Sequence, residues 1–221
     1  MTSRNRLCAC SPGMVVDGLH TLTMAALFDS GWDDVVSAAV GALATALLII
    51  VGARVRFHLP SPAAQPVTGQ TFGASLAPFF FGRGPATTGA ALYVALALFG
   101  APVLAGGRRG VSGASLGYIV GFVACAFLSA PPSSEAAGAP FAREVAATRQ
   151  SGAIGVFAIV LLGSALGQLA AAVTGAAWLA ARGAGARNAI SHGLRPFVPG
   201  LIVKAVLVAL TITAASIAMG R

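Results

Sequence analysis

Lys204 is the residue whose type and position point most directly to chemistry. It is the chain's only lysine, and it lies in a long apolar stretch just after Pro199 and Gly200. A charge inside a membrane segment costs at least ~2.5–3.5 kcal/mol, so such residues usually face a partner or a cavity. No acidic residue lies in any apolar stretch to pair with it. The pattern predicts a ligand-facing ammonium suited to a carboxylate or another hydrogen-bond acceptor, or a side chain that reaches back to the near membrane surface.

Five other polar side chains stand in or beside apolar stretches. Tyr93 and Tyr118 each offer one hydroxyl, which either contacts a ligand or forms a hydrogen bond within the core. Gln70 and Thr71 begin a short apolar segment and either cap it or touch a ligand, whereas Gln168 is expected to bond a neighbouring helix. We take Gln70, Tyr93 and Tyr118 forward as candidate ligand contacts.

Catalytic and metal-binding patterns are missing from the sequence. There is no H-E-x-x-H, no G-x-S-x-G and no pair of carboxylates within an apolar stretch, so we do not expect an enzyme. No nucleotide-binding loop is present, so any step driven by ATP must come from another subunit. Three scattered cysteines are a weak metal signal, and we expect neither a metal nor a cofactor. The net charge of +8 is spread between apolar runs, which argues against nucleic-acid binding.

The composition places the chain in a lipid bilayer. Hydrophobic residues make up 57% of it and charged residues only 9%, whereas a soluble domain carries roughly 25% charged residues. The mean hydropathy is +0.84. Such a chain cannot cover a water-facing surface but can cover a lipid-facing one, so we predict a multi-pass membrane protein.

The apolar runs divide the chain into an N-terminal extension, residues 1–30, and a six-helix membrane domain, residues 31–221. Prolines and glycines interrupt the second and third runs, and the fifth is long enough to be a tilted helix or one broken near Gly175. A polar connection is predicted from Arg182 to Pro196. The six predicted helices are Val35–Ala53, Thr71–Phe81, Pro85–Gly100, Ser115–Ala130, Ser151–Ala181 and Pro199–Met219, with Pro85 as the first residue of the third.

The short, interrupted helices favour transport, because irregular backbone within a membrane survives only against protein or a water-filled cavity. The alternative is that they are re-entrant packing elements. With six spans, the first, third and fifth connections emerge on one face, and these are the most distinctive Gly- and Pro-containing loops. We predict a ligand mouth there.

Small residues recur along the first predicted helix. Ala38, Ala42 and Ala46 follow at i, i+4 and i+8, a spacing that lets another helix approach closely. This stripe is the candidate surface for a partner subunit.

Four segments together resemble the BioY family: PVTGQTFGASLAPFFFG (66–82), ALYVALALFGAPVLAGG (91–107), GYIVGF (117–122) and RPFVPGLIVKA (195–205). BioY proteins are the biotin-binding S components of energy-coupling-factor (ECF) transporters. The resemblance implies an all-α membrane protein with six transmembrane helices in an ECF S-component-like bundle. It also implies a multi-pass location in a bacterial plasma membrane, and as partners a transmembrane coupling subunit and a pair of ATPases.

The resemblance also implies a ligand site, and the sequence departs from the family pattern at two places. Biotin would lie beneath the odd-numbered connections, against Lys204, with Tyr118 and the turn at Gly106 and Gly107 shaping the site. Leu201 stands where family members usually carry an aspartate. The resemblance implies that this aspartate accepts from the ureido N–H groups of biotin, which leucine does not do. The family's G-P-T-G-G-Y turn here reads GASLGY (113–118), and Ser115 and Tyr118 in it are candidate ligand contacts.

Three functions follow from these features. The leading hypothesis is biotin uptake as the substrate-binding transmembrane subunit of an ECF-type transporter. Leu201 motivates the second, a divergent paralogue that transports another small anionic compound. The third is a non-transporting membrane scaffold that has kept the fold without the ligand.

Overall fold

The computed structural model of the chain describes residues 34–57, 67–111, 113–129 and 152–219. The predicted N-terminal extension lies outside these ranges. The chain divides into two units, Met1–Val36 and Ser37–Arg221, and nearly all described residues belong to the second.

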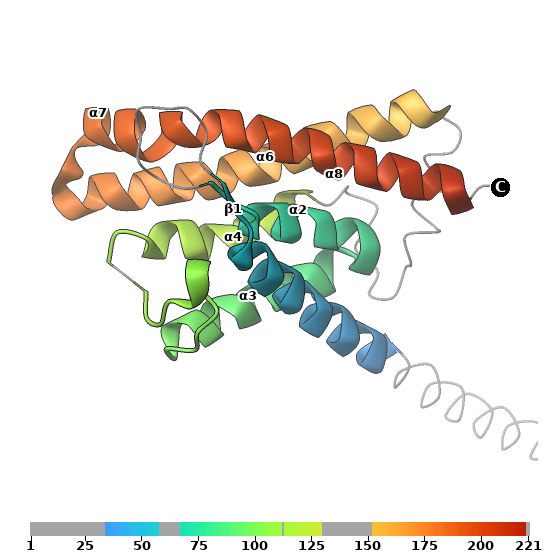
Figure 1. Cartoon of the computed structure of the whole chain (residues 1–221), viewed down its shortest axis with the longest axis horizontal. Helices are drawn as coiled ribbons and strands as arrows, with labels where there is room; N and C mark the ends of the chain where they lie inside the picture. Colours follow the sequence, from blue (N-terminus) through green and yellow to red (C-terminus); the bar gives the residue numbers. More distant parts are fainter. Residues whose placement is uncertain (1–33, 58–66, 112, 130–151, 220–221) are drawn as a thin grey trace, which may run out of the picture. The chain divides into compact units, whose positions relative to one another are not determined.

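Six helices of twelve or more residues make up most of the described chain (Figure 1). They match the six predicted apolar runs and confirm an all-α membrane fold. Three helical stretches are long and apolar enough to cross a bilayer: Asp34–Arg54, Gly152–Ala184 and Ala186–Ala218. The six helices are Asp34–Arg54, α2 (Gln70–Phe81), α3 (Arg83–Leu98), α4 (Leu116–Ser129), α6 (Gly152–Leu179) and α8 (Val198–Met219).

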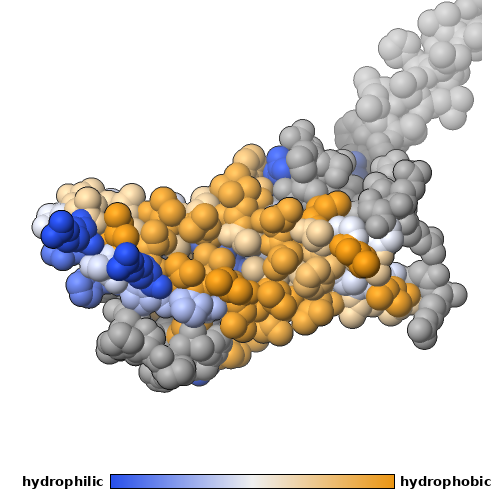
Figure 2. Space-filling model, turned by 90° about the horizontal axis from the view of Figure 1, so that it is seen from above, coloured by the Kyte–Doolittle hydropathy of each residue, from blue (hydrophilic) through white to orange (hydrophobic). Residues whose placement is uncertain are grey.

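The outer surface of α6 and α8 is apolar. Large aliphatic side chains such as Leu162 on α6 and Ile202 on α8 are exposed, as a lipid-facing surface requires. Figure 2 shows this apolar surface seen from above, with hydrophilic residues gathered at the end where α7 lies.

A two-stranded hairpin connects the first helix to α2. Strands β1 (Arg56–Phe57) and β2 (Val67–Thr68) pair antiparallel, with Arg56 opposite Thr68. Val67 is buried, and its Cγ1 lies 2.8 Å from where a Cβ on Gly200 would stand. The hairpin is therefore seated on the start of α8, and this close approach requires glycine there.

Helices α2 and α3 are joined by Gly82 alone. Its φ of 82° and ψ of 164° end one helix and begin the next, a conformation that L side chains resist. The new helix begins at Arg83, so Pro85 is its third residue rather than its first as predicted. Proline is tolerated there because the first turn makes no use of its missing N–H.

Glycines let the first helix approach α2 and α3 closely. A Cβ on Gly73 of α2 would lie 2.7 Å from the Leu48 carbonyl oxygen, and one on Gly89 of α3 would lie 2.6 Å from Thr45 Cβ. Small residues at helix contacts allow such approach in membranes, where packing and not the hydrophobic effect drives association.

This contact covers part of the alanine stripe on the first helix. Ala42 and Ala46 are only 8% and 3% exposed because α2 and α3 cover them, while Ala38 is partly exposed. Ala42 and Ala46 therefore pack within the chain, and a partner-subunit surface along the stripe stays a prediction. The outward side of the same helix carries bulky side chains instead, including Leu43 and Leu47.

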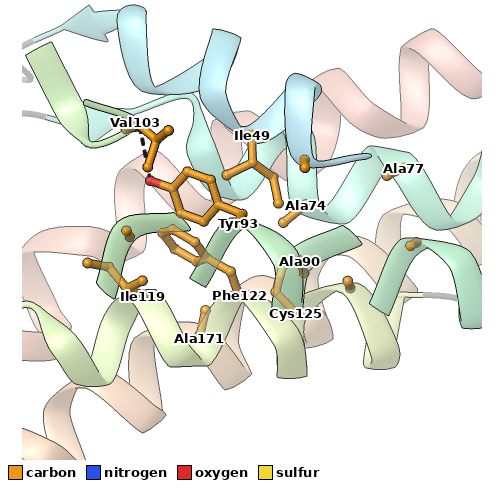
Figure 3. Packing of buried hydrophobic residues seen from close by; sticks show 14 of the residues in the cluster. Ile49, Ala74, Ala77, Ala90, Tyr93, Val103, Ile119, Phe122, Cys125 and Ala171 are labelled. Carbon is orange, nitrogen blue, oxygen red and sulfur yellow. Dashed lines mark hydrogen bonds between the residues drawn. The ribbon is translucent and has the colours of Figure 1, made fainter. Parts of the chain in front are cut away.

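Small and aromatic residues fill the core between the first helix, α2, α3 and α4 (Figure 3). Tyr93 is fully buried, and its ring lies 5.9 Å from that of Phe122, centroid to centroid. Alanines such as Ala74 and Ala90 surround the two rings. The two aromatic rings fill space that the small alanine side chains of this core leave open.

Helix α6 packs against both α4 and α8, alongside which it runs in Figure 1. A glycine seam joins α6 to α4: a Cβ on Gly121 would lie 2.9 Å from Ala171 Cα, and one on Gly163 would lie 2.7 Å from the Ser129 carbonyl oxygen. Helix α6 continues through Gly175 to Leu179, so it is long and unbroken at that point.

The connection between α6 and α8, predicted as a polar connection over Arg182–Pro196, is helical. A π-helical turn (Ala180–Ala184) leads into the short α7 (Ala186–Asn188), and further turns reach Phe197. Gly183 and Gly185 have φ values of 94° and 75° and separate the turns. The alanines and arginines on either side of these glycines have high helix propensity, which the polar appearance of the segment conceals.

Candidate functional site

Lys204 points into the bundle. Helix α8 begins at Val198, so the lysine lies roughly 9 Å along the helix axis. The residue is only 8% exposed, and its Nζ donates a hydrogen bond to Thr71 Oγ1 on α2. This direction favours the ligand-facing interpretation over a side chain that reaches back to the membrane surface.

A chain of neutral polar groups continues from Thr71 into α6. The Thr71 hydroxyl donates to Gln168 Oε1 at 3.5 Å, and Gln168 Nε2 donates to Ser164 Oγ at 3.1 Å and Ser75 Oγ at 3.4 Å. Gln168, Ser164 and Ser75 are all buried. Buried polar groups without partners are costly, so a connected network of this kind holds its members in fixed orientations.

Helix α4 adds a thiol to the same cluster. Cys125 Sγ lies 3.9 Å from the Thr71 carbonyl oxygen and 4.0 Å from Ser129 Oγ. Helices α2, α4, α6 and α8 thus all contribute polar groups around Lys204. In the described ranges the only acidic residue is Asp34, at the start of the first helix, so no carboxylate there balances the ammonium.

Gln70 and Tyr93 form a second polar group beside the first. Gln70 Nε2 donates to the Tyr93 hydroxyl at 2.5 Å, and that hydroxyl donates to the Val103 carbonyl oxygen at 3.3 Å (Figure 3). Thr68 Oγ1 donates to Gln70 Oε1 at 2.9 Å. These bonds tie the hairpin, α2 and α3 to the loop after α3. The predicted ligand contacts at Gln70 and Tyr93 stay predictions, and in this structure both side chains hold the loop.

Gly106 and Gly107 form a turn that two arginines cover. Their φ values are 73° and 74°, and a Cβ at either position would lie 2.8 Å from a guanidinium nitrogen, that of Arg56 or Arg54 respectively. Arg54 also donates from Nη2 to the Pro102 carbonyl oxygen at 3.0 Å. Only glycine fits this turn, which is consistent with a shaping role, although no described contact joins it to Lys204.

Tyr118 joins the third connection to the fifth. Its hydroxyl donates to the Gly193 carbonyl oxygen at 2.6 Å, and its ring lies 5.2 Å from that of Phe197. The backbone carbonyl oxygen of Ser115 accepts a hydrogen bond from the backbone N–H of Ile119, one turn later, at 3.1 Å. Trp178 Nε1 donates to the Gly113 carbonyl oxygen at 2.7 Å. These bonds bring the third and fifth connections together, and the seating of Val67 on Gly200 adds the first, as predicted.

The sequence reading missed the partners of Lys204. Thr71 and Ser75 are four residues apart on α2, and Ser164 and Gln168 are four apart on α6. Residues at this spacing share one face of a helix. Two such polar pairs in otherwise apolar helices indicate polar faces that turn toward the interior. This pattern could have predicted that the four residues lie near the lysine.

Comparison with known proteins decides the family. The model of the BioY family matches residues 21–221 of the chain. The chain belongs to the BioY family. A crystal structure described as the S-component for biotin from an ECF-type ABC transporter shares the fold, with a TM-score of 0.61 and 24% sequence identity. The match covers 85% of this chain and 92% of the solved one. No curated protein matches.

Leu201 is the position at which this chain differs from the BioY family pattern close to Lys204. Leu201 is partly buried and lies three residues before Lys204, hence on the same side of α8. The carboxylate that the family resemblance places here is therefore absent from the immediate neighbourhood of the ammonium. What surrounds Lys204 in this BioY chain is a neutral set of hydroxyl, amide and thiol groups.

Proposed function

We propose that this chain is the substrate-binding transmembrane subunit of an ECF-type transporter and that its substrate is biotin. Family membership and the shared S-component fold support the transporter class. The proposed binding site is the polar cluster around Lys204, beneath the three connections that meet on one side of the bundle.

The observation that carries the proposal is the inward-facing, uncompensated ammonium of Lys204. It uses one N–H on Thr71, and among the described residues nothing else accepts from it, so two donors remain for a ligand. Biotin offers two acceptors of suitable strength, the ureido carbonyl oxygen and the carboxylate. A buried ammonium that has no role in binding would be a cost without a compensating gain.

Uptake and binding test the proposal directly. The chain is expressed, with the coupling subunits of its host, in a bacterium unable to take up biotin, and accumulation of labelled biotin is measured. We expect uptake with the wild-type chain and its loss with Lys204→Met. The chain carrying Thr174→Val, which removes an α6 hydroxyl that donates to the Ala170 carbonyl oxygen of its own helix, is the matched control and retains uptake. Normal uptake by Lys204→Met would overturn the site assignment.

We propose a bacterial plasma membrane as the location and a coupling subunit with two ATPases as the partners. The sequence holds no nucleotide-binding loop, so ATP-driven uptake requires such subunits. Because Ala42 and Ala46 are covered by α2 and α3, a partner that contacts the first helix does so on its outward side, near Leu43 and Leu47. Co-purification of ATPase subunits with the tagged chain tests the partnership.

Leu201 supports a second candidate substrate, another small anionic compound. Without a carboxylate next to Lys204, the site carries a net positive charge that a ligand anion would neutralise. Competition between labelled biotin and a panel of small carboxylates separates these two candidate substrates. If biotin is the substrate, the panel displaces little of the labelled biotin.

A further inference from the structure

The hydrogen bonds around Lys204 run in one direction, from the ammonium toward α6. Lys204 Nζ donates to Thr71 Oγ1, and the Thr71 hydroxyl donates to Gln168 Oε1 at 3.5 Å. A hydroxyl has a single proton, so accepting from the ammonium leaves Thr71 that proton for Gln168. Gln168 Nε2 then donates onward to Ser164 and Ser75. Each group turns its acceptor toward the lysine, which stabilises a positive charge without a carboxylate.

Gln168 is buried, only 2% exposed, and is held at both ends of its amide. Its neighbour Gly167 belongs to the seam between α4 and α6, where a Cβ would lie 2.5 Å from the Cys125 carbonyl oxygen. Gln168 therefore projects from closely packed backbone.

We infer that Gln168 is a positioning residue for the ligand site and acts on Lys204 through Thr71. Its amide oxygen fixes the direction of the Thr71 hydroxyl proton, so the hydroxyl's lone pairs face the ammonium. Lys204 then gives one N–H to Thr71 and keeps the other two aimed at a ligand acceptor. Gln168 itself does not touch the ammonium. The inference rests on the proposed function only in taking Lys204 as the ligand's anchor.

A test without ligand uses the fact that Lys204 is the only lysine. The full chain is labelled with ¹³C-lysine in detergent micelles, and the single Cε resonance is followed by NMR. We expect Gln168→Leu to shift this resonance in the same direction as Thr71→Val, and Thr174→Val to leave it in place. A resonance that moves with Thr71→Val but not with Gln168→Leu would overturn the inference.

A second test measures biotin binding in a double-mutant cycle. Thr71→Val and Gln168→Leu should each weaken binding roughly tenfold, the scale of one hydrogen bond to a charged group. Because both changes interrupt the same chain of bonds, the double variant should also lose roughly tenfold. A loss of roughly a hundredfold would mean that the two residues act independently and would refute the positioning role.

The two tests separate the inference from the proposed function. If the wild-type chain binds no biotin, the proposed substrate fails while the lysine resonance still decides whether Gln168 acts on Lys204. If biotin binds normally and neither Gln168→Leu measurement changes, the substrate stands and the positioning role is refuted. Monodisperse elution of each variant establishes that it has folded.

Discussion

Replacing Lys204 by methionine separates the destabilisation caused by the buried ammonium from its contribution to ligand binding. Methionine keeps an unbranched chain of similar length and removes the charge and the hydrogen bond to Thr71. The lysine is 8% exposed, so nearly all of its side chain is out of contact with water. The substitution is therefore expected to change stability and binding in opposite directions.

The size of the stability change follows from two opposing contributions. A charged side chain inside the membrane costs ~2.5–3.5 kcal/mol on insertion scales. The hydrogen bond from the ammonium to Thr71 returns about 1.5–3 kcal/mol. The difference leaves the lysine costly by about 1 kcal/mol, so the ligand-free Lys204→Met variant should unfold roughly 2–4 °C higher than the wild type.

Binding should fall as stability rises. Truncating one partner of a buried, charged hydrogen-bonded contact costs about 2–5 kcal/mol, which corresponds to a loss of affinity of roughly thirtyfold or more. Thermal unfolding in detergent and equilibrium binding of labelled biotin measure the two effects on the same preparation. A Lys204→Met variant that binds biotin normally and unfolds at a lower temperature would refute the reasoning, because the ammonium would then be a structural group.

Three further substitutions test other parts of the structure. Leu201→Asp places a carboxylate one helical turn before Lys204, and biotin affinity should rise in equilibrium binding if biotin is the substrate; an unchanged or lower affinity favours a different anionic compound. Gly89→Val inserts a side chain where α3 meets the first helix, and thermal unfolding should show a loss of about 1–3 kcal/mol or more; wild-type stability would contradict the close approach. Tyr93→Phe leaves the Gln70 amide and the Val103 carbonyl oxygen without their hydrogen-bond partner. The free energy of unfolding should therefore fall by about 1–3 kcal/mol, while biotin affinity changes little. A large loss of affinity with unchanged stability would instead make Tyr93 a ligand contact.

The membrane helices were predictable because their signal is strong and local. Uncharged runs bounded by arginine, proline or glycine fixed the six helices to within a few residues, and the meeting of the odd-numbered connections followed from counting spans. Residues 182–196 were harder to place. Their arginines and glycines suggest a loop, yet short helical turns fill the segment because intervening alanines favour helix wherever glycine does not interrupt.

Side-chain direction was the part that the sequence left open. In an apolar helix with small residues on every side, periodicity does not show which face is inward, since lipid and core are equally apolar. This is why the sequence did not show that Ala42 and Ala46 of the alanine stripe face inward. It is also why Lys204 was recognised as unusual while Thr71 and Gln168, which decide its orientation, were not joined to it.

The glycine seam between α4 and α6 determines which parts of the bundle can move. With backbones this close at Gly121, Gly163 and Gly167, the two helices have no side-chain layer between them that could rearrange, so they behave as a single stiff plate. Gln168 is carried on that plate, so the amide that accepts from Thr71 has a fixed position in the bundle.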